Sequence, residues 1–280
     1  MKFYSSFWLF LFLTAFYCQA QEKTNPIPLT YQSTMIGFGG IEVFDTYLSP
    51  LRYTGSNFSV IYEQMKMTRL MNGNISSQHL LNFEIGNTTN PTQTATSYVA
   101  YLDYAYGLYY KLNPIQKLQV FVGPQIDAWA GVIYNDRNGN NPASVKTNLN
   151  LNGSGMISYP IQINRQQILL RYQLSLPLMG VLFSPAYGQS YYEISLGVND
   201  NLVHFASFHN QLAMRNLLSV EFPLNLWTFR LSFMNWIYET QVNDLDTRIM
   251  TNTIYVGFSK NFFIVPGRNQ DKTQFRTVFD

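Results

Sequence analysis

The feature of this sequence that most limits its fold is a sustained alternation of apolar and polar residues with a period of two. Between residues 98 and 112 every even position is apolar or aromatic, whereas the odd positions include Asp103, Gly107 and Lys111. Successive side chains of a β-strand point to opposite faces, and an α-helix does not give this pattern over more than about 10 residues. The segment is therefore predicted to be a strand with one apolar face.

The same period recurs through most of the chain. It is found in residues 118–134, 146–159, 168–176, 212–222, 229–233 and 254–258. Strands of globular sheets average about 5 or 6 residues, whereas strands of membrane barrels have about 10. The predicted fold is all-β, a closed antiparallel transmembrane β-barrel. A soluble β-sandwich is less favoured, because it would expose long polar faces on oversized strands.

The composition differs from that of an ordinary soluble domain, because charged residues are scarce. Only 12% of the residues are charged, against 46% hydrophobic and 16% aromatic, and the mean hydropathy is -0.08. A soluble domain has roughly 25% charged residues, and a membrane-spanning helix needs about 20 consecutive apolar ones, which no later stretch provides. The formal net charge of +2 comes without a basic stripe, so nucleic acid is not an expected partner.

The N-terminus resembles a secretory signal. Lys2 precedes an apolar run at residues 7–13, and cleavage is expected near Ala20. Tyr17 stands where a lipoprotein would have a small residue before Cys18, so lipidation is disfavoured. Cys18 is the only cysteine, so the mature chain is expected to have no disulfide, no thiol chemistry and no cysteine-ligated metal.

The chain is accordingly divided into four parts. These are a signal peptide (residues 1–20), a periplasmic N-terminal segment (21–33), an outer-membrane barrel (34–263) and a periplasmic C-terminal tail (264–280). The predicted location is the outer membrane of a Gram-negative bacterium. The expected surroundings are a lipid bilayer with lipopolysaccharide, and barrel-assembly machinery during insertion.

Connection lengths give an independent indication, because bacterial barrels alternate short periplasmic turns with longer external loops. Long connections are expected at residues 48–56, 87–95, 135–144, 177–189 and 241–246, and short ones at 70–74, 113–116, 161–165, 199–201 and 224–225. A tight link near Asn210 breaks the rule. This counting gives about twelve strands with both termini in the periplasm, and residues 190–211 are where it is least certain.

If the apolar faces point to lipid, charged residues fall inside the barrel, nearly one per strand. The predicted lumen residues are Glu42, Glu63, Glu84, Asp103, Asp127, Arg171, Arg215, Glu221 and Arg230. A charge facing the bilayer midplane would cost about 2 to 4 kcal/mol. A lattice of paired acids and arginines that fills a small barrel is the favoured interpretation, and a polar conduit or binding cavity is the alternative.

Two predicted external loops carry candidate binding residues. Asp136, Arg137, Asn138 and Asn140 have the spacing of a calcium loop, but a glycine falls inside the triplet and no glutamate follows, so an ordinary turn is favoured and no metal is predicted. The aromatic and polar loop at residues 183–193 could bind a ligand or partner, or fold inward as a plug. Its candidates are Tyr187, Gln189, Tyr191, Tyr192 and Glu193.

Catalysis has one weak candidate. Ser207, His209 and Asn210 cluster in the sequence, whereas outer-membrane phospholipases have the order His-x-Ser-Asn. No phosphate-binding glycine loop, zinc signature or dinucleotide fingerprint is present, so no cofactor is expected and an enzyme is disfavoured.

Several motifs resemble those of a known family. They are residues 45–51, 131–135, 137–143, 183–185, 187–193 and 208–211. The chain is similar over most of its mature length to the Gram-negative family called domain of unknown function 3316. The resemblance implies an outer-membrane barrel and brings no established activity, so no functional residue can be carried over.

Three functions from different classes remain open. The first is a narrow pore or small-molecule binder that uses the charged lumen. The second is a structural or partner-binding barrel that acts through its external loops, and the third is a lipid hydrolase that uses Ser207 and His209.

Overall fold

The fold is that of a computed structural model. It describes residues 27–163, 166–197, 201–224, 227–262, 275–276 and 278–279. The predicted signal peptide and residues 21–26 lie outside this description. None of the helices in the described part of the chain is both long and apolar enough to span a membrane.

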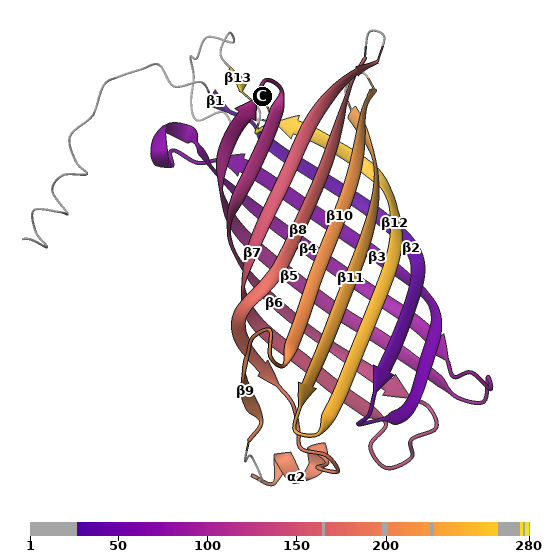
Figure 1. Cartoon of the computed structure of the whole chain (residues 1–280). Helices are drawn as coiled ribbons and strands as arrows, with labels where there is room; N and C mark the ends of the chain where they lie inside the picture. Colours follow the sequence, from indigo (N-terminus) through magenta and orange to yellow (C-terminus); the bar gives the residue numbers. More distant parts are fainter. Residues whose placement is uncertain are drawn as a thin grey trace, which may run out of the picture.

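Ten antiparallel strands close into a barrel (Figure 1). They are β2 (Thr30–Asp45), β3 (Ser49–Met67), β4 (Ile75–Thr89), β5 (Thr96–Ile115), β6 (Leu118–Asn135), β7 (Ala143–Ile163), β8 (Gln166–Phe183), β10 (Gln211–Leu224), β11 (Trp227–Val242) and β12 (Leu245–Phe262). Each strand pairs with the next, and β12 pairs with β2 from Thr247↔Asp45 to Phe262↔Thr30. Closure leaves no open edge around the ring, as a membrane barrel requires.

Shorter elements lie at the two ends of the barrel. The parallel pair β1 (Ile27–Pro28) and β13 (Phe275–Arg276) lies at the terminal end, where β2 begins and β12 ends (Figure 1). The 3-10 helix η1 (Leu70–Gly73) turns β3 into β4. The opposite end is the loop end, which carries α2 (Tyr191–Ser195) and β9 (Val203–Ala206).

The strand count of about twelve is too high by two, and both surplus strands were placed in residues 190–211. This region is one long connection between β8 and β10, residues 184–210, called the flap below; its residues 198–200 lie outside the description. Ser190 and Glu193 form a capping box that starts α2, and β9 pairs only with the end of β8, outside the ring.

Loop lengths also differ from the prediction at two places. The connections predicted at residues 48–56 and 241–246 are tight turns at 46–48 and 243–244, because the flanking strands continue beyond the expected ends. The flap is therefore much the longest connection at the loop end.

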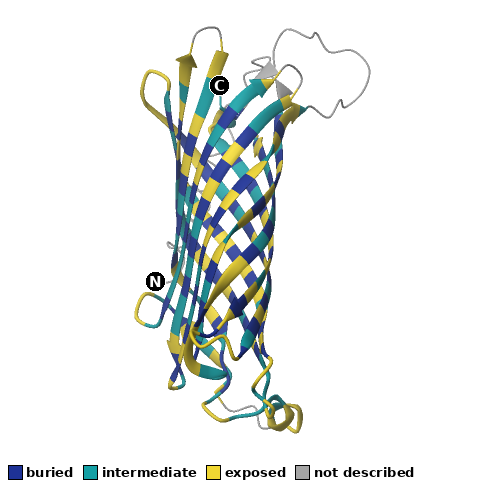
Figure 2. Cartoon of the chain, turned by 90° about the vertical axis from the view of Figure 1, so that its right-hand side faces the viewer, coloured by how far each residue is buried: buried dark blue, intermediate teal, exposed yellow. Residues whose placement is uncertain are grey.

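The alternation predicted from the sequence is confirmed by burial (Figure 2). In β5, Tyr101 and Asp103 are buried in the barrel, whereas Leu102 and Tyr104 are exposed on its outer face. The apolar face therefore points outward and the polar face inward, which is the reverse of a soluble protein and the pattern of a membrane barrel.

Gly123 and Gly257 are among the glycines at which neighbouring strands of the barrel approach most closely. A Cβ at Gly123 would overlap the backbone oxygen of Leu108, and one at Gly257 would overlap that of Thr34. Adjacent strands approach too closely at these points for any side chain, so the sequence places glycine there.

Candidate functional site: the lumen and the loop end

The middle of the lumen is crossed by a charged network. Arg171 on β8 contacts Glu63 on β3 at 2.7 Å and Glu221 on β10 at 3.1 Å, and Arg230 on β11 also contacts Glu63. The Tyr31 hydroxyl donates to Glu221 Oε1 at 2.6 Å. Because β3 and β8 are opposite each other in the ring of strands, this central network spans the full width of the barrel.

A second cluster lies nearer the loop end. Arg215 on β10 contacts Asp103 on β5 and lies 2.8 Å from Asp127 on β6. Beyond it, Lys146 on β7 pairs at 3.2 Å with Asp45 on β2, again from opposite walls. Buried charges are costly unless they are paired and hydrogen-bonded. Each of these charges has an oppositely charged partner, although Asp103 Oδ1 and Asp45 Oδ2 accept no hydrogen bond among the described residues.

Eight of the nine predicted lumen residues lie buried inside the barrel, and one does not. The eight are Glu63, Glu84, Asp103, Asp127, Arg171, Arg215, Glu221 and Arg230. The prediction for Glu42 is wrong: its neighbours Ile41 and Val43 point inward, and its own side chain pairs with exposed Arg52 on the outer face at 3.5 Å. Asp45 and Lys146 were missed as an ion pair, although Lys146 stands on the polar face of its predicted strand.

Glu84 differs from the other buried acids. It accepts a hydrogen bond from Asn57 Nδ2 at 2.6 Å, and within the described residues it forms no ion pair. The Asn57 amide therefore takes the place of a basic partner at this level of the lumen.

An aromatic layer fills the lumen at the level where the two walls of β5–β6 and β11 face each other. Trp129 and Tyr238 stack with ring centroids 4.7 Å apart, and Tyr101 and Trp236 lie 4.8 Å apart. All four are buried. The layer adds apolar packing to the charged clusters.

The chain's own C-terminal residues enter the terminal end of the lumen. Lys111 Nζ donates to the Val278 backbone oxygen at 3.2 Å, and Gln119 Nε2 donates to that of Phe279 at 2.9 Å. The Phe279 ring lies 4.5 Å from the Arg171 guanidinium and packs edge-on against Tyr31. Val278 and Phe279, from the predicted periplasmic tail, thus lie inside the barrel on the terminal-end side of the central network.

The flap lies across the loop end. Tyr47, in the β2–β3 turn, donates through its hydroxyl to the Gln189 backbone oxygen at 2.8 Å, and its ring packs on Tyr191. The Tyr191 hydroxyl accepts from the Val145 N–H on β7 at 2.6 Å, and Asn243 Nδ2, in the β11–β12 turn, donates to a flap carbonyl. The flap therefore ties together three separate parts of the rim.

These contacts shift the pKa values of groups in the flap and in the neighbouring β2–β3 turn. Burial, together with Tyr191 and Asp45 nearby, raises the pKa of Tyr47 to about 12. Burial also raises the pKa of Tyr191. Hydrogen bonds from the backbone and hydroxyl of Ser190 lower the pKa of Glu193, which is fully exposed. Tyr187 and Tyr192 lie on the flap with 71% of their surface exposed.

The loop at residues 136–142 serves as a tie between neighbouring turns. Asp136 accepts from the Thr96 N–H at 2.8 Å, Arg137 donates to the Thr94 oxygen, and Asn138 donates to the Leu48 oxygen. Asn140 lies in the same loop. In the part of the chain that is described, no three His, Cys, Asp or Glu residues come close enough to hold a metal ion.

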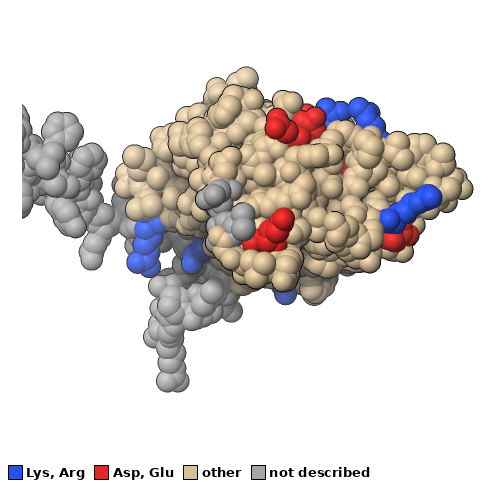
Figure 3. All heavy atoms as spheres, turned by 90° about the horizontal axis from the view of Figure 1, so that it is seen from below, with Lys and Arg blue, Asp and Glu red and all other residues tan. Residues whose placement is uncertain are grey.

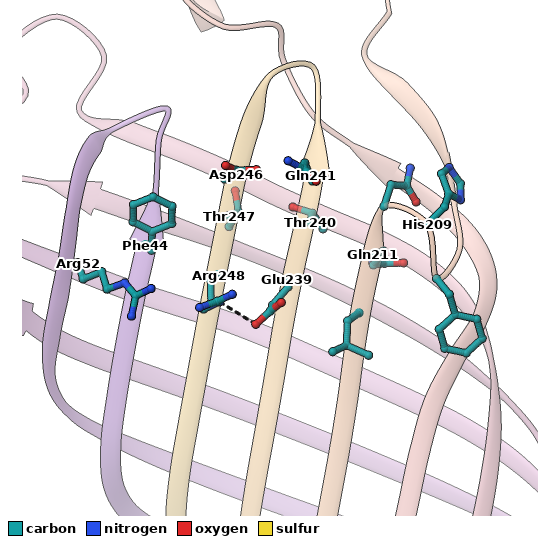
Figure 4. A pocket seen from close by; sticks show the side chains of 13 residues that line it. Phe44, Arg52, His209, Gln211, Glu239, Thr240, Gln241, Asp246, Thr247 and Arg248 are labelled. Atoms are coloured by element: carbon teal, nitrogen blue, oxygen red, sulfur yellow. Dashed lines mark ion pairs between the residues drawn. The ribbon is translucent and has the colours of Figure 1, made fainter.

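An outer groove of about 380 Å³ runs along the wall at the loop end (Figure 4). Turn 207–210 forms one side, and the ends of β11, β12, β2 and β3 form the rest. Arg248 Nε and Glu239 Oε1 lie 2.7 Å apart there, and Arg52 lies further along the wall. Seen from the loop end, charged side chains stand at separate points of a mostly uncharged surface (Figure 3).

The catalytic candidates meet in this turn. Ser207 Oγ lies 2.6 Å from His209 Nδ1. Asn210 accepts from the Ser207 N–H and donates to the Phe205 oxygen, so it holds the turn rather than orienting the imidazole. Among the described residues His209 has no hydrogen bond to a carboxylate, which a serine hydrolase would use to orient its base.

Comparisons with known proteins found one family and several solved structures. A family model described as "Protein of unknown function (DUF3316)" matches residues 6–269. The outer membrane protease OmpT from Escherichia coli aligns with TM-score 0.46 and 7% identity, over 87% of this chain and 99% of that one. The transport unit of the autotransporter AIDA-I from Escherichia coli gives 0.45 and 9%, over 90% and 94%. The COG4313 outer membrane channel from Pseudomonas putida F1 gives 0.37 and 7%, over 87% and 100%.

At such identities the likeness concerns the fold alone. No curated protein matches the sequence.

Proposed function

The chain belongs to the family described as Protein of unknown function (DUF3316), and from that premise we propose that it is a sealed outer-membrane barrel that binds a partner through its loop end. The observation that carries the proposal is the filled lumen. Glu63 and Arg230 have 0% of their surface exposed, so no water-sized sphere touches them. An ion conduit needs a hydrated path, which makes the narrow pore the weaker candidate.

A location in the outer membrane is supported by the outer face. Exposed apolar residues fill the wall between the Glu239–Arg248 pair at the loop end and Lys260 beside Trp227 at the terminal end. Charged and aromatic residues flanking an apolar band are typical of barrels in lipid. In this arrangement the terminal end faces the periplasm, and assembly machinery inserts the barrel into a bilayer that contains lipopolysaccharide.

Binding at the loop end is supported by the flap. Val203, Phe205 and Phe208 are 69%, 60% and 61% exposed. Among the described strands, β9 pairs only with β8, so no further strand covers its other edge, although the Phe205 oxygen accepts from Asn210 Nδ2. An exposed edge strand with apolar side chains can accept an extended segment of another protein. The expected partner is therefore a protein at the cell surface.

Conductance in planar bilayers tests the sealed lumen. Wild-type protein should give no steady channels, and an open porin reconstituted in the same detergent serves as the positive control. Stable channels from the wild type, altered by Arg171→Ala or Arg215→Ala, would overturn the proposal in favour of a pore.

Thiol labelling on intact cells tests the orientation. With Cys18 replaced by serine, Phe205→Cys should react with a membrane-impermeant maleimide. Asn72→Cys, in η1 at the terminal end, should react only after the cells are opened. The opposite pattern would place the flap in the periplasm and exclude a surface partner.

A lipid hydrolase is the second candidate, favoured only by the short Ser207–His209 contact beside the outer groove. It requires that any lipase activity of the purified protein disappear in both Ser207→Ala and His209→Ala. Activity that persists in either variant excludes it.

A further inference from the structure

Three asparagines form a ladder on the outer face of the barrel. Asn216 on β10, Asn235 on β11 and Asn252 on β12 are direct neighbours in register. Asn216 Nδ2 donates to Asn235 Oδ1 at 3.2 Å, and Asn235 Nδ2 donates to Asn252 Oδ1 at 2.9 Å. The Tyr172 hydroxyl on β8 completes the chain by donating to Asn216 at 2.8 Å. Four adjacent strands thus carry one connected polar row.

This row lies within the apolar band. Leu218, Phe233 and Ile254 flank it on the side of the terminal end, and all three are exposed. Glu239 and Arg248 stand four residues from Asn235 and Asn252, which is about 14 Å along a strand and roughly 10 Å in height at a tilt near 45°. Given the membrane location of the proposed function, the ladder faces hydrocarbon rather than water.

Hydrogen-bonding groups remain unused along the ladder. A carboxamide has two N–H donors and an oxygen that accepts twice. Among the described residues, no hydrogen bond uses the Asn252 N–H groups. Acyl chains offer no acceptor, and an unsatisfied polar group in hydrocarbon costs several kcal/mol. Whatever covers the ladder must therefore carry polar groups at the same depth in the membrane, so acyl chains alone do not satisfy it.

A second copy of this chain meets that requirement. A carboxamide is self-complementary, and a twofold axis along the membrane normal brings identical residues together at equal depth. Gly40 and Ser56 continue the row beyond Asn252 on β2 and β3, so the side chains at the level of the row are small there, while Phe38 projects from β2 on the side of the terminal end. Between the ladder and the loop end, the Glu42–Arg52 and Glu239–Arg248 pairs offer both signs of charge to the same pairs of the second copy.

We propose that the outer face of β10–β12 is a homodimer interface within the membrane, in which the unused amide groups at Asn252 pair with those of the second copy. Small and polar residues are the usual means by which membrane segments associate, since burial of apolar surface gives no driving force there. The barrel is then half of an assembly that places two flaps side by side.

Disulfide trapping in native membranes tests the proposal. With Cys18→Ser as background, Asn252→Cys should give a covalent dimer on mild oxidation. Leu149→Cys, exposed on β7, is the matched control and should not. Equal crosslinking at both positions, or none at Asn252→Cys, would overturn the proposal.

A second variant separates association from folding. Asn216→Leu, Asn235→Leu and Asn252→Leu together should leave a heat-modifiable, folded barrel that runs as a monomer, with association weakened at least about tenfold. A dimer that persists in this variant contradicts the interface. Native mass spectrometry that finds a wild-type monomer carrying lipid contradicts it too. Membrane fractionation tests the proposed function separately, because an outer-membrane monomer refutes only the dimer.

Discussion

At the residue scale, Glu63 holds the central network together. It contacts both Arg171 and Arg230, and it is fully buried. Glu42 comes from the same kind of alternating strand, yet it lies on the outer face in an exposed pair. The two faces of β2 are hard to tell apart from the sequence, because Ile41 and Val43 on the inward face are as apolar as Ile36 and Phe38, which share the outward face with Glu42.

The two glutamates make a matched pair for mutation. Glu63→Gln should lower the free energy of unfolding by about 3 to 5 kcal/mol, since it leaves the two buried arginines, Arg171 and Arg230, with only the carboxylate of Glu221 to share. Glu42→Gln should change it by at most about 1 kcal/mol. Urea unfolding in detergent, followed by tryptophan fluorescence, measures both. Similar losses for the two variants would mean that the network contributes nothing beyond a surface pair.

At the element scale, the alternation with a period of two predicted the strands of the ring. The prediction failed in residues 190–211, where a helix-start signal is also present. The strands of the ring were predictable because each has one lipid-facing and one lumen-facing row. Residues 190–211 were read as two strands, although Ser190 followed by Glu193 is a capping-box signal for a helix start. The pairing of β9 with β8 outside the ring depends on tertiary contacts that no local pattern carries.

The flap should loosen in acid. Hydrogen bonds from Ser190 lower the pKa of Glu193 in the folded flap, so their stabilisation is present above the ordinary glutamate pKa of about 4.3 and is lost as the pH falls through the lowered value. The hydrogen-exchange protection of α2, which is the exchange rate relative to that of an unstructured peptide at the same pH, should fall in the wild type between neutral pH and about pH 3. Glu193→Gln, which keeps an acceptor but cannot titrate, should show a flatter profile. Parallel profiles would assign the loosening to another group.

Raising the pH should weaken a different contact of the flap, the hydrogen bond from the Tyr47 hydroxyl to Gln189. The pKa of Tyr47 is raised to about 12. Its hydroxyl therefore keeps donating to Gln189 below the ordinary tyrosine pKa of about 10, and the contact is lost as the pH rises through about 12. Tyr47→Phe removes the same contact at every pH, so at neutral pH residues 186–197 should exchange their amide hydrogens faster in this variant than in the wild type. Unchanged exchange in this variant would exclude the contact as a tie.

At the scale of the whole molecule, the lumen is closed at several levels in series. The C-terminal residues fill the terminal end, the central network fills the middle, and the aromatic layer and flap follow towards the loop end. The charged residues were predictable as lumen residues. The tail was not, because its residues show no alternation and their position depends on which distant side chains meet inside the closed ring.

Cysteine accessibility can test whether the C-terminal tail and the central network each close the lumen. Ser158 lies near the tail, and Ser59 lies beyond the central network; both are 0% exposed. Deleting residues 263–280 should make Ser158→Cys reactive to a polar maleimide in detergent, because the terminal end is then open to water. Ser59→Cys should stay protected with or without the tail, since Glu63, Arg171 and Arg230 still block the way. Labelling of Ser59→Cys at the rate of Ser158→Cys would show that the tail alone closes the barrel, and the charged network would then be the lining of a pore.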